Sequence, residues 1–305
     1  MGLPEIYQQV KGTIVAFCAK YEPIESPEDQ PLFPRIIGTG FIVRPDGLII
    51  TNEHVVRAFR REFRPPGVPS TDHCVYALLF HMIEEGQVEI PLEVVGCGGI
   101  ESMSHGPAYY GPKRPDVAFV HVKARGLPTA QVRPGREIVE GMEIATAGYP
   151  MGTDTLLAPG YVHQMTPTLQ QGIVSAVLPY ACDSPHAFMI NVMTQGGASG
   201  SPVFDPGSGE ILGVLYAGLN DIGVTKKKDL YKRPTNISYV VPARYVQTLV
   251  AWADSSEDVK TPDDALTIDQ MLERTEPHDV VKEGRKEQVM DLRIRRQDNL
   301  PPAEC

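Results

Sequence analysis

The feature that most constrains this chain is a series of short β-rich runs between about residue 10 and residue 250, separated by glycine, proline and aspartate turns. Short strands at such spacing, with turn residues between them, are typical of an all-β sandwich or barrel. We count twelve runs, the number needed for two six-stranded antiparallel β-barrels. They are TIVAFCA, RIIGTGFIV, GLIITN, CVYALLF, LEVVGC, VAFVHV, EIATAGY, QQGIVSAV, AFMINVM, SPVF, ILGVLYAG and ISYVVP.

Helices are predicted only at the two ends of this region. Residues 4–7 indicate a short N-terminal helix. The stretch from Pro242 to Trp252 begins with proline, which is favourable at the first helical position, and continues with apolar residues at helical spacing. Those residues are Tyr245, Val246, Leu249 and Val250. We therefore predict one domain over residues 1–252, closed by this C-terminal helix.

Residues 253–305 are predicted to be a separate, acidic and polar tail. From residue 254 onward there are 14 acidic and 8 basic residues, so this stretch carries six of the chain's ten net negative charges, and no Phe, Trp or Tyr follows Trp252. A segment of this composition buries little apolar surface. It is either disordered or a loosely docked helix and strand, and the composition favours the flexible alternative.

The composition, 42% hydrophobic and 22% charged, is that of a soluble globular protein. The chain has no run of about 18 apolar residues that could span a bilayer, and its first residues, MGLPEIYQQVKG, lack a basic and apolar leader. These patterns predict a cytoplasmic protein without a membrane partner. One basic cluster lies in a presumed loop, which is typical of a solvated turn and does not favour a nucleic-acid partner. It comprises Lys226, Lys227, Lys228, Lys232 and Arg233.

The cysteines do not indicate a disulfide framework or a zinc site, because they are odd in number, far apart and without a CxxC pair. They are Cys18, Cys74, Cys97, Cys182 and Cys305. The scattered histidines also lack the spacing of metal ligands. We therefore predict no metal and no cofactor.

Three segments carry residues suited to acyl transfer, which needs a nucleophile, a base and donors for a developing oxyanion. In GTGFIVRPDGLIITNEHVV, a predicted hairpin places His54 just past the end of a strand. In RPDVAFVHV, Asp116 lies at the start of an apolar strand. In MTQGGASGSPVF, Ser199 lies between glycines in a tight turn. Each residue alone has a structural alternative, since histidines after strands, aspartates at strand starts and glycine-rich turns are all common. The three together, in this order, favour catalysis.

These segments resemble the chymotrypsin/trypsin superfamily of serine proteases, most closely the protease domain of the HtrA/Deg family, over about residues 4–252. The resemblance implies a trypsin-like serine endopeptidase that acts on proteins or peptides. It implies that His54 is the general base, that Asp116 fixes the imidazole tautomer, and that Ser199 attacks the carbonyl to form an acyl-enzyme. The amides of Gly197 and Ser199 would form the oxyanion hole.

The sequence departs from the family pattern around the nucleophile, where it reads Gly197-Ala198-Ser199-Gly200-Ser201. Ala198 has no carboxylate to pair with a newly cut N-terminus, so activation by N-terminal cleavage, as in secreted trypsins, is not expected. Ser201 adds a hydroxymethyl group where the family has glycine, which puts the local geometry in question. The residues after Trp252 are too few and too polar for the PDZ domain that HtrA proteins usually carry.

The same resemblance implies a substrate pocket. Met193 and Thr194 would lie at its base, Ile237 in its wall, and residues 216–218 would pair with the substrate backbone as an added strand. The last three residues are Tyr216, Ala217 and Gly218. Because no acidic residue lies at the base, we expect small or medium apolar side chains before the scissile bond. The alternative is that these residues belong to the barrel core.

Two further functions stay open at this point. One is a protease-fold binding or scaffold protein without turnover, which the presence of all three catalytic residue types disfavours. The other is esterase activity, which the same residues support chemically. A regulatory protein partner and a homo-oligomer also stay open.

Overall fold

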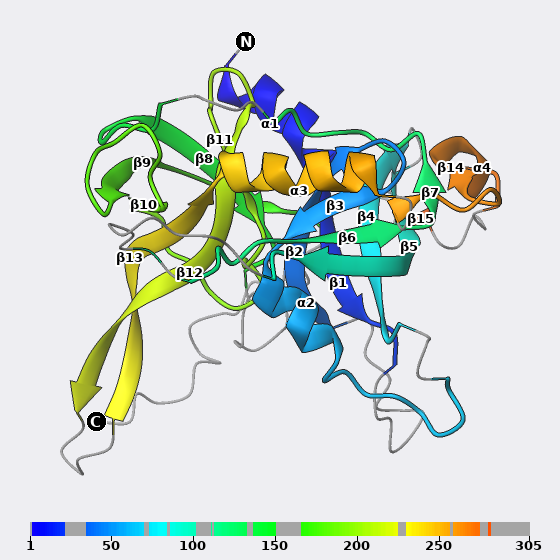
Figure 1. The fold of residues 1–305 in the computed structure, drawn as a ribbon. Coiled ribbons are helices and arrows are strands. Elements are labelled where there is room, and N and C mark those ends of the chain that lie inside the picture. The colour runs from blue at the N-terminus through cyan, green and yellow to red at the C-terminus, as the bar shows by residue number, and fades with distance from the viewer. Residues whose placement is uncertain are drawn as a thin grey trace, which may run out of the picture.

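The computed structural model describes residues 2–21, 35–69, 73–83, 86–101, 111, 113–132, 137–150, 166–224, 230–256, 259–274 and 280–281. Within these ranges the chain forms two closed six-stranded antiparallel β-barrels, set beside each other (Figure 1). The predicted all-β fold with a C-terminal helix is therefore confirmed.

In the first barrel the strands are hydrogen-bonded in the order β5-β4-β1-β2-β3-β6, and the pairing of β5 with β6 closes the barrel. Its strands are β1 (Ile14–Ala19), β2 (Ile36–Arg44), β3 (Leu48–Thr51), β4 (Val75–Ile83), β5 (Gly86–Gly99) and β6 (Ala118–Val122). All six residues of β1 are buried. Val15 and Phe17 pack into the barrel interior, whereas Ile14 and Ala16 pack into the core shared with the second barrel. This strand is a continuous apolar run because both of its faces are covered.

The second barrel has the strand order β10-β13-β12-β11-β8-β9. Its strands are β8 (Glu143–Gly148), β9 (Thr168–Leu178), β10 (Ala187–Ile190), β11 (Pro202–Phe204), β12 (Ile211–Val224) and β13 (Leu230–Pro242). All twelve predicted runs are strands in these barrels. The sequence missed how far β12 and β13 extend, since their outer ends form a hairpin that projects from the barrel (Figure 1).

Two helices at the ends of the barrel region cover the shared core. In α1 (Leu3–Lys11), Ile6 and Val10 lie one turn apart and are both buried. In α3 (Ala243–Ser255), the residues predicted from helical spacing face the protein, with Val250 partly buried and the other three buried. A third helix, α2 (Glu53–Phe59), follows β3 directly, where the sequence predicted only the end of a strand.

The described part of the segment after α3 packs on the first barrel. Strand β14 (Leu266–Thr267) runs parallel to β7 (Ala124–Arg125), and β15 (Val280–Val281) pairs with the edge of β5. The short helix α4 (Ile268–Leu272) adds Ile268 to the apolar cluster of the first barrel. Of the two alternatives predicted for the tail, a flexible segment or a docked helix and strand, these described residues adopt the second.

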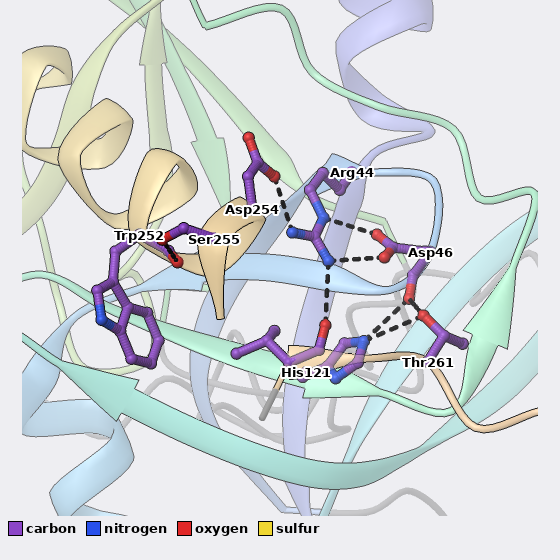
Figure 2. A network of polar contacts seen from close by, with 8 residues as sticks. Arg44, Asp46, His121, Trp252, Asp254, Ser255 and Thr261 are labelled. Atoms are coloured by element: carbon purple, nitrogen blue, oxygen red, sulfur yellow. Dashed lines mark hydrogen bonds and ion pairs between the residues drawn. The ribbon is translucent and has the colours of Figure 1, made fainter. Parts of the chain in front are cut away.

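A network of polar contacts at the end of β2 holds the start of this segment (Figure 2). Arg44 donates to both carboxylate oxygens of Asp46, at 2.8 and 2.6 Å, to Asp254 Oδ1 at 2.9 Å and to the carbonyl oxygen of Val259 at 3.4 Å. Thr261 Oγ1 donates to the carbonyl oxygen of Asp46 at 2.7 Å, and His121 Nε2 lies 3.1 Å from the same oxygen. One arginine thus joins β2 to both the end of α3 and the segment beyond it.

Replacing Arg44 with methionine is expected to lower the free energy of unfolding by about 1–2 kcal/mol. The arginine side chain is only 17% exposed, and methionine cannot make its charge-assisted hydrogen bonds. The loss is limited because both partner carboxylates are partly exposed to water. Urea unfolding measures the change. The matched control is Lys123→Met, which removes an ion pair to the exposed Asp264 and should leave stability nearly unchanged. Equal effects of the two substitutions would contradict this role of Arg44.

His121 makes stability depend on pH. Burial lowers its pKa and outweighs the contact with Asp46, so folding favours the neutral imidazole. The unfolded value is about 6.5, so this stabilising contribution is complete above that pH and is lost as the pH falls toward the folded pKa. In urea titrations between about pH 7.5 and 5, His121→Gln should show a shallower loss of stability than the wild type. Parallel pH curves for the two proteins would refute the prediction.

Candidate active site

His54 and Asp116 are in direct contact. Helix α2 begins after Asn52, so His54 lies in its first turn, beside the start of β6. His54 Nδ1 is 2.5 Å from Asp116 Oδ2, and the backbone amide of His54 donates to Asp116 Oδ1 at 3.0 Å. Because the carboxylate accepts at Nδ1, that nitrogen carries the proton of a neutral imidazole. The other ring nitrogen, Nε2, is then the one that can accept a proton.

The buried side chain of Asn52 supports this pair. Its Nδ2 donates to the carbonyl oxygen of Asp116 at 2.7 Å, which ties the backbone of Asp116 to the turn that holds His54. Sequence reasoning missed Asn52. The available signal was its position between a strand and the histidine, where asparagine is a favoured residue at the start of a helix.

Ser199 lies in a tight turn that is held between the two barrels. Its carbonyl oxygen accepts from the Thr39 amide of β2 at 2.8 Å, and the next amide, that of Gly200, donates to the carbonyl oxygen of Leu215 in β12 at 2.9 Å. Gly200 has φ +89°, and a Cβ there would lie 2.0 Å from the Thr39 carbonyl oxygen. Only glycine fits this approach of the turn to β2.

Thr39 is a second residue that sequence reasoning missed. Its buried hydroxyl donates to the carbonyl oxygen of Gly197 at 2.7 Å and accepts from the Tyr149 amide at 3.1 Å. The contact holds the Gly197 carbonyl oxygen on β2. In this turn, neither the Gly197 amide nor the Ser199 amide donates to a backbone carbonyl within the described residues. Both donors therefore stay available to a ligand.

The two unusual residues of this turn fit their surroundings. Ser201, in place of the family's glycine, is buried and donates from Oγ to the Ala198 carbonyl oxygen at 2.6 Å. The added hydroxymethyl group therefore braces the turn. Ala198 is itself buried in the core of the second barrel, where an ionised side chain would need a partner.

The Ser199 turn and helix α2 meet on the same strand. A Cβ placed on Gly38 of β2 would come within 2.8 Å of Val55 in α2 and within 3.4 Å of the Ser199 carbonyl oxygen. The described side chains of Ser199 and His54 share no hydrogen bond in this structure. Catalytic hydrogen bonds are often long in unliganded sites and shorten when substrate is bound.

A cavity of about 510 Å³ opens beside Ser199. Its lining is Thr194, Gln195, Gly196, Ser199, Leu215, Tyr216, Ala217, Gly218, Asn220 and Pro234. Four predicted binding residues belong to this lining, at positions 194 and 216–218, whereas Met193 and Ile237 do not. None of the lining residues is acidic. The sequence missed Asn220 and Pro234 because they lie on the extended part of β12 and β13.

The chemistry open to this site is limited by its residues. Within the described ranges, no group of three or more histidine, cysteine, aspartate or glutamate side chains could hold a metal ion. None of the described helices is long and apolar enough to cross a membrane. The groups at hand are an imidazole with an oriented carboxylate, a hydroxyl in a tight turn and two backbone amides that donate to no backbone carbonyl among the described residues.

The sequence matches the trypsin-like peptidase domain family over residues 38–214, a stretch that includes all three candidate catalytic residues. The chain belongs to this family. The resemblance to trypsin-like serine proteases is thereby confirmed.

Among curated trypsin-like relatives, the chain is similar to two proteins named probable periplasmic serine endoprotease DegP-like. It is 26% identical over 180 residues to that of Halomonas elongata, covering 59% of this chain and 29% of the relative. It is 28% identical over 182 residues to that of Ectopseudomonas mendocina, covering 58% and 28%. The chain therefore spans less than a third of the length of these relatives. Among solved structures, HtrA-type protease AlgW with tripeptide matches 82% of this chain and 63% of its own, with 14% identity and a TM-score of 0.48.

The predicted cytoplasmic location is wrong by this comparison, because the trypsin-like relatives are named periplasmic. The prediction relied on the composition, on the lack of a run of about 18 apolar residues and on the first residues of the chain. The four cysteines that the structure describes are indeed free. Free thiols do not determine a compartment.

Proposed function

We propose that this chain is a serine endopeptidase in which His54 is the general base, Asp116 orients it and Ser199 is the nucleophile. The observation that carries the proposal is the 2.5 Å contact between His54 Nδ1 and Asp116 Oδ2, next to the Ser199 turn. Asp116 holds the tautomer in which Nε2 accepts a proton, and it stabilises the imidazolium that follows. A surface histidine without such a carboxylate would not be oriented in this way.

The proposed reaction has two stages. His54 takes the proton of Ser199 as Oγ attacks the carbonyl carbon, and the amides of Gly197 and Ser199 donate to the resulting oxyanion. His54 then gives the proton to the leaving amine, which leaves an acyl-enzyme on Ser199. Water attacks this ester by the same route in reverse and releases the acid.

The proposed substrates are proteins or peptides with a small or medium apolar side chain before the scissile bond. Support comes from the cavity beside Ser199, whose described lining residues include no carboxylate to neutralise a lysine or arginine. Tyr216, Ala217 and Gly218 follow one another along the cavity and offer backbone groups to an extended peptide. A cleavage profile from a peptide library, dominated by lysine or arginine at this position, would overturn the preference.

Hydrolysis of casein, compared with hydrolysis of an activated ester, tests the function itself. We expect cleavage of casein by the wild type and none by Ser199→Ala. Ester hydrolysis without casein cleavage would favour an esterase, and inactivity toward both would favour a protease-fold binding or scaffold protein. The proposed partner is a protein or peptide substrate; a regulatory protein partner and a homo-oligomer are not part of the proposal.

A further inference from the structure

Two hydroxyl groups form a short relay in the wall of the cavity beside Ser199. Ser238 Oγ is fully buried and donates to the carbonyl oxygen of Val192 at 2.6 Å. Thr194 Oγ1, which belongs to a residue of the cavity lining, lies 3.0 Å from Ser238 Oγ. The relay therefore runs from the cavity wall through Ser238 to the backbone.

The number of protons in this relay fixes its direction. A carbonyl oxygen only accepts, so the single hydroxyl proton of Ser238 is committed to Val192. In the contact between the two hydroxyls, Thr194 must then be the donor, and its own single proton is committed to Ser238. What remains on Thr194 Oγ1 is acceptor capacity alone.

This acceptor lies beside Gly218 in the cavity lining. A Cβ added to Gly218 would come within 2.6 Å of Thr194 Oγ1, and both residues line the cavity. No side chain of Gly218 covers the hydroxyl, and Thr194 is only half-buried. A substrate side chain entering the cavity can therefore reach this oxygen.

We propose that Thr194 is a specificity-determining residue that favours, among small side chains of equal shape, the one that carries a hydrogen-bond donor. The inference rests on the proposed endopeptidase function and refines its apolar preference. A substrate threonine can donate to Thr194 Oγ1, whereas a valine of the same shape leaves that oxygen desolvated and unpaired. Sites in which a bound ligand buries such a polar atom discriminate against a ligand that lacks the matching group.

The test uses peptides that differ only in threonine or valine before the scissile bond. The wild type is expected to show a kcat/KM about tenfold higher for the threonine peptide. Thr194→Val, which keeps the shape and removes the acceptor, should bring this ratio to one or below. Thr194→Ser, which keeps the hydroxyl, should retain the preference. The matched control is Thr248→Val on the outer face of α3, which should leave the ratio unchanged.

The ratio separates this inference from the function on which it rests. If the wild type cleaves neither peptide, or if cleavage persists in Ser199→Ala, the proposed function fails. If the wild type cleaves the valine peptide at least as fast as the threonine peptide, or if Thr194→Val keeps the threonine preference, the specificity role fails and the endopeptidase function stands. A change in the ratio for the Thr248 control would also defeat the assignment to Thr194.

Discussion

Ser199→Ala is expected to lower kcat for peptide cleavage by on the order of 10⁶-fold, the effect of removing the nucleophile from a Ser-His-Asp site. Among the described residues Ser199 Oγ makes no hydrogen bond, so its removal should leave the fold intact. Steady-state kinetics with a peptide substrate measures the loss, and thermal unfolding should show a nearly unchanged midpoint.

The matched control for this substitution is Ser201→Ala, two residues away. The Ser201 hydroxyl only braces the turn through the Ala198 carbonyl oxygen, so its loss should cost about 1 kcal/mol of stability and less than about tenfold in activity. Retention of wild-type turnover by Ser199→Ala, or an equal loss in both variants, would be incompatible with a nucleophilic role for Ser199.

Asp116→Asn is expected to lower kcat/KM by about 10⁴-fold, because an amide in place of the carboxylate favours the wrong tautomer of His54. The amide oxygen of asparagine can still accept from the His54 backbone amide, so the local structure should be kept. Kinetics with a peptide substrate, together with circular dichroism of the folded variant, measures the effect.

Asp46→Asn provides the control for a change from carboxylate to amide. Asp46 belongs to the network around Arg44, at the other end of the β2–β3 hairpin from His54. That variant should lose stability and keep most of its activity. An Asp116→Asn enzyme with near wild-type turnover would show that the carboxylate does not orient the base.

The positions of the strands could be predicted because their apolar runs are dictated by burial. β1 is buried on both faces, and α3 carries its buried residues at helical spacing, so each pattern is visible locally. The extended hairpin of β12 and β13 was not visible, since residues 219–222 and 233–234, which belong to its described outer part, are exposed and leave no pattern of burial in the sequence. The docked β14 depends on pairing with β7. Contacts between segments so far apart leave no periodic signal.

The site could be predicted only as far as side-chain chemistry is visible in a motif. His54, Asp116 and Ser199 were found through the resemblance of their segments. Thr39 was missed because it acts on Gly197 from 158 residues away, and Asn52 was missed because it holds a backbone carbonyl. Supporting residues of this kind are revealed by hydrogen bonds in three dimensions and not by sequence spacing.

Covalent labelling with a serine-directed fluorophosphonate tests the central claim most directly. After incubation of the folded protein, mass spectrometry of the intact chain and of its peptides should find one adduct, located on Ser199. Labelling should be absent in Ser199→Ala and much slower in His54→Ala, because the base activates the hydroxyl. An unlabelled wild type, or labelling that persists unchanged in Ser199→Ala, would contradict the assignment of this site.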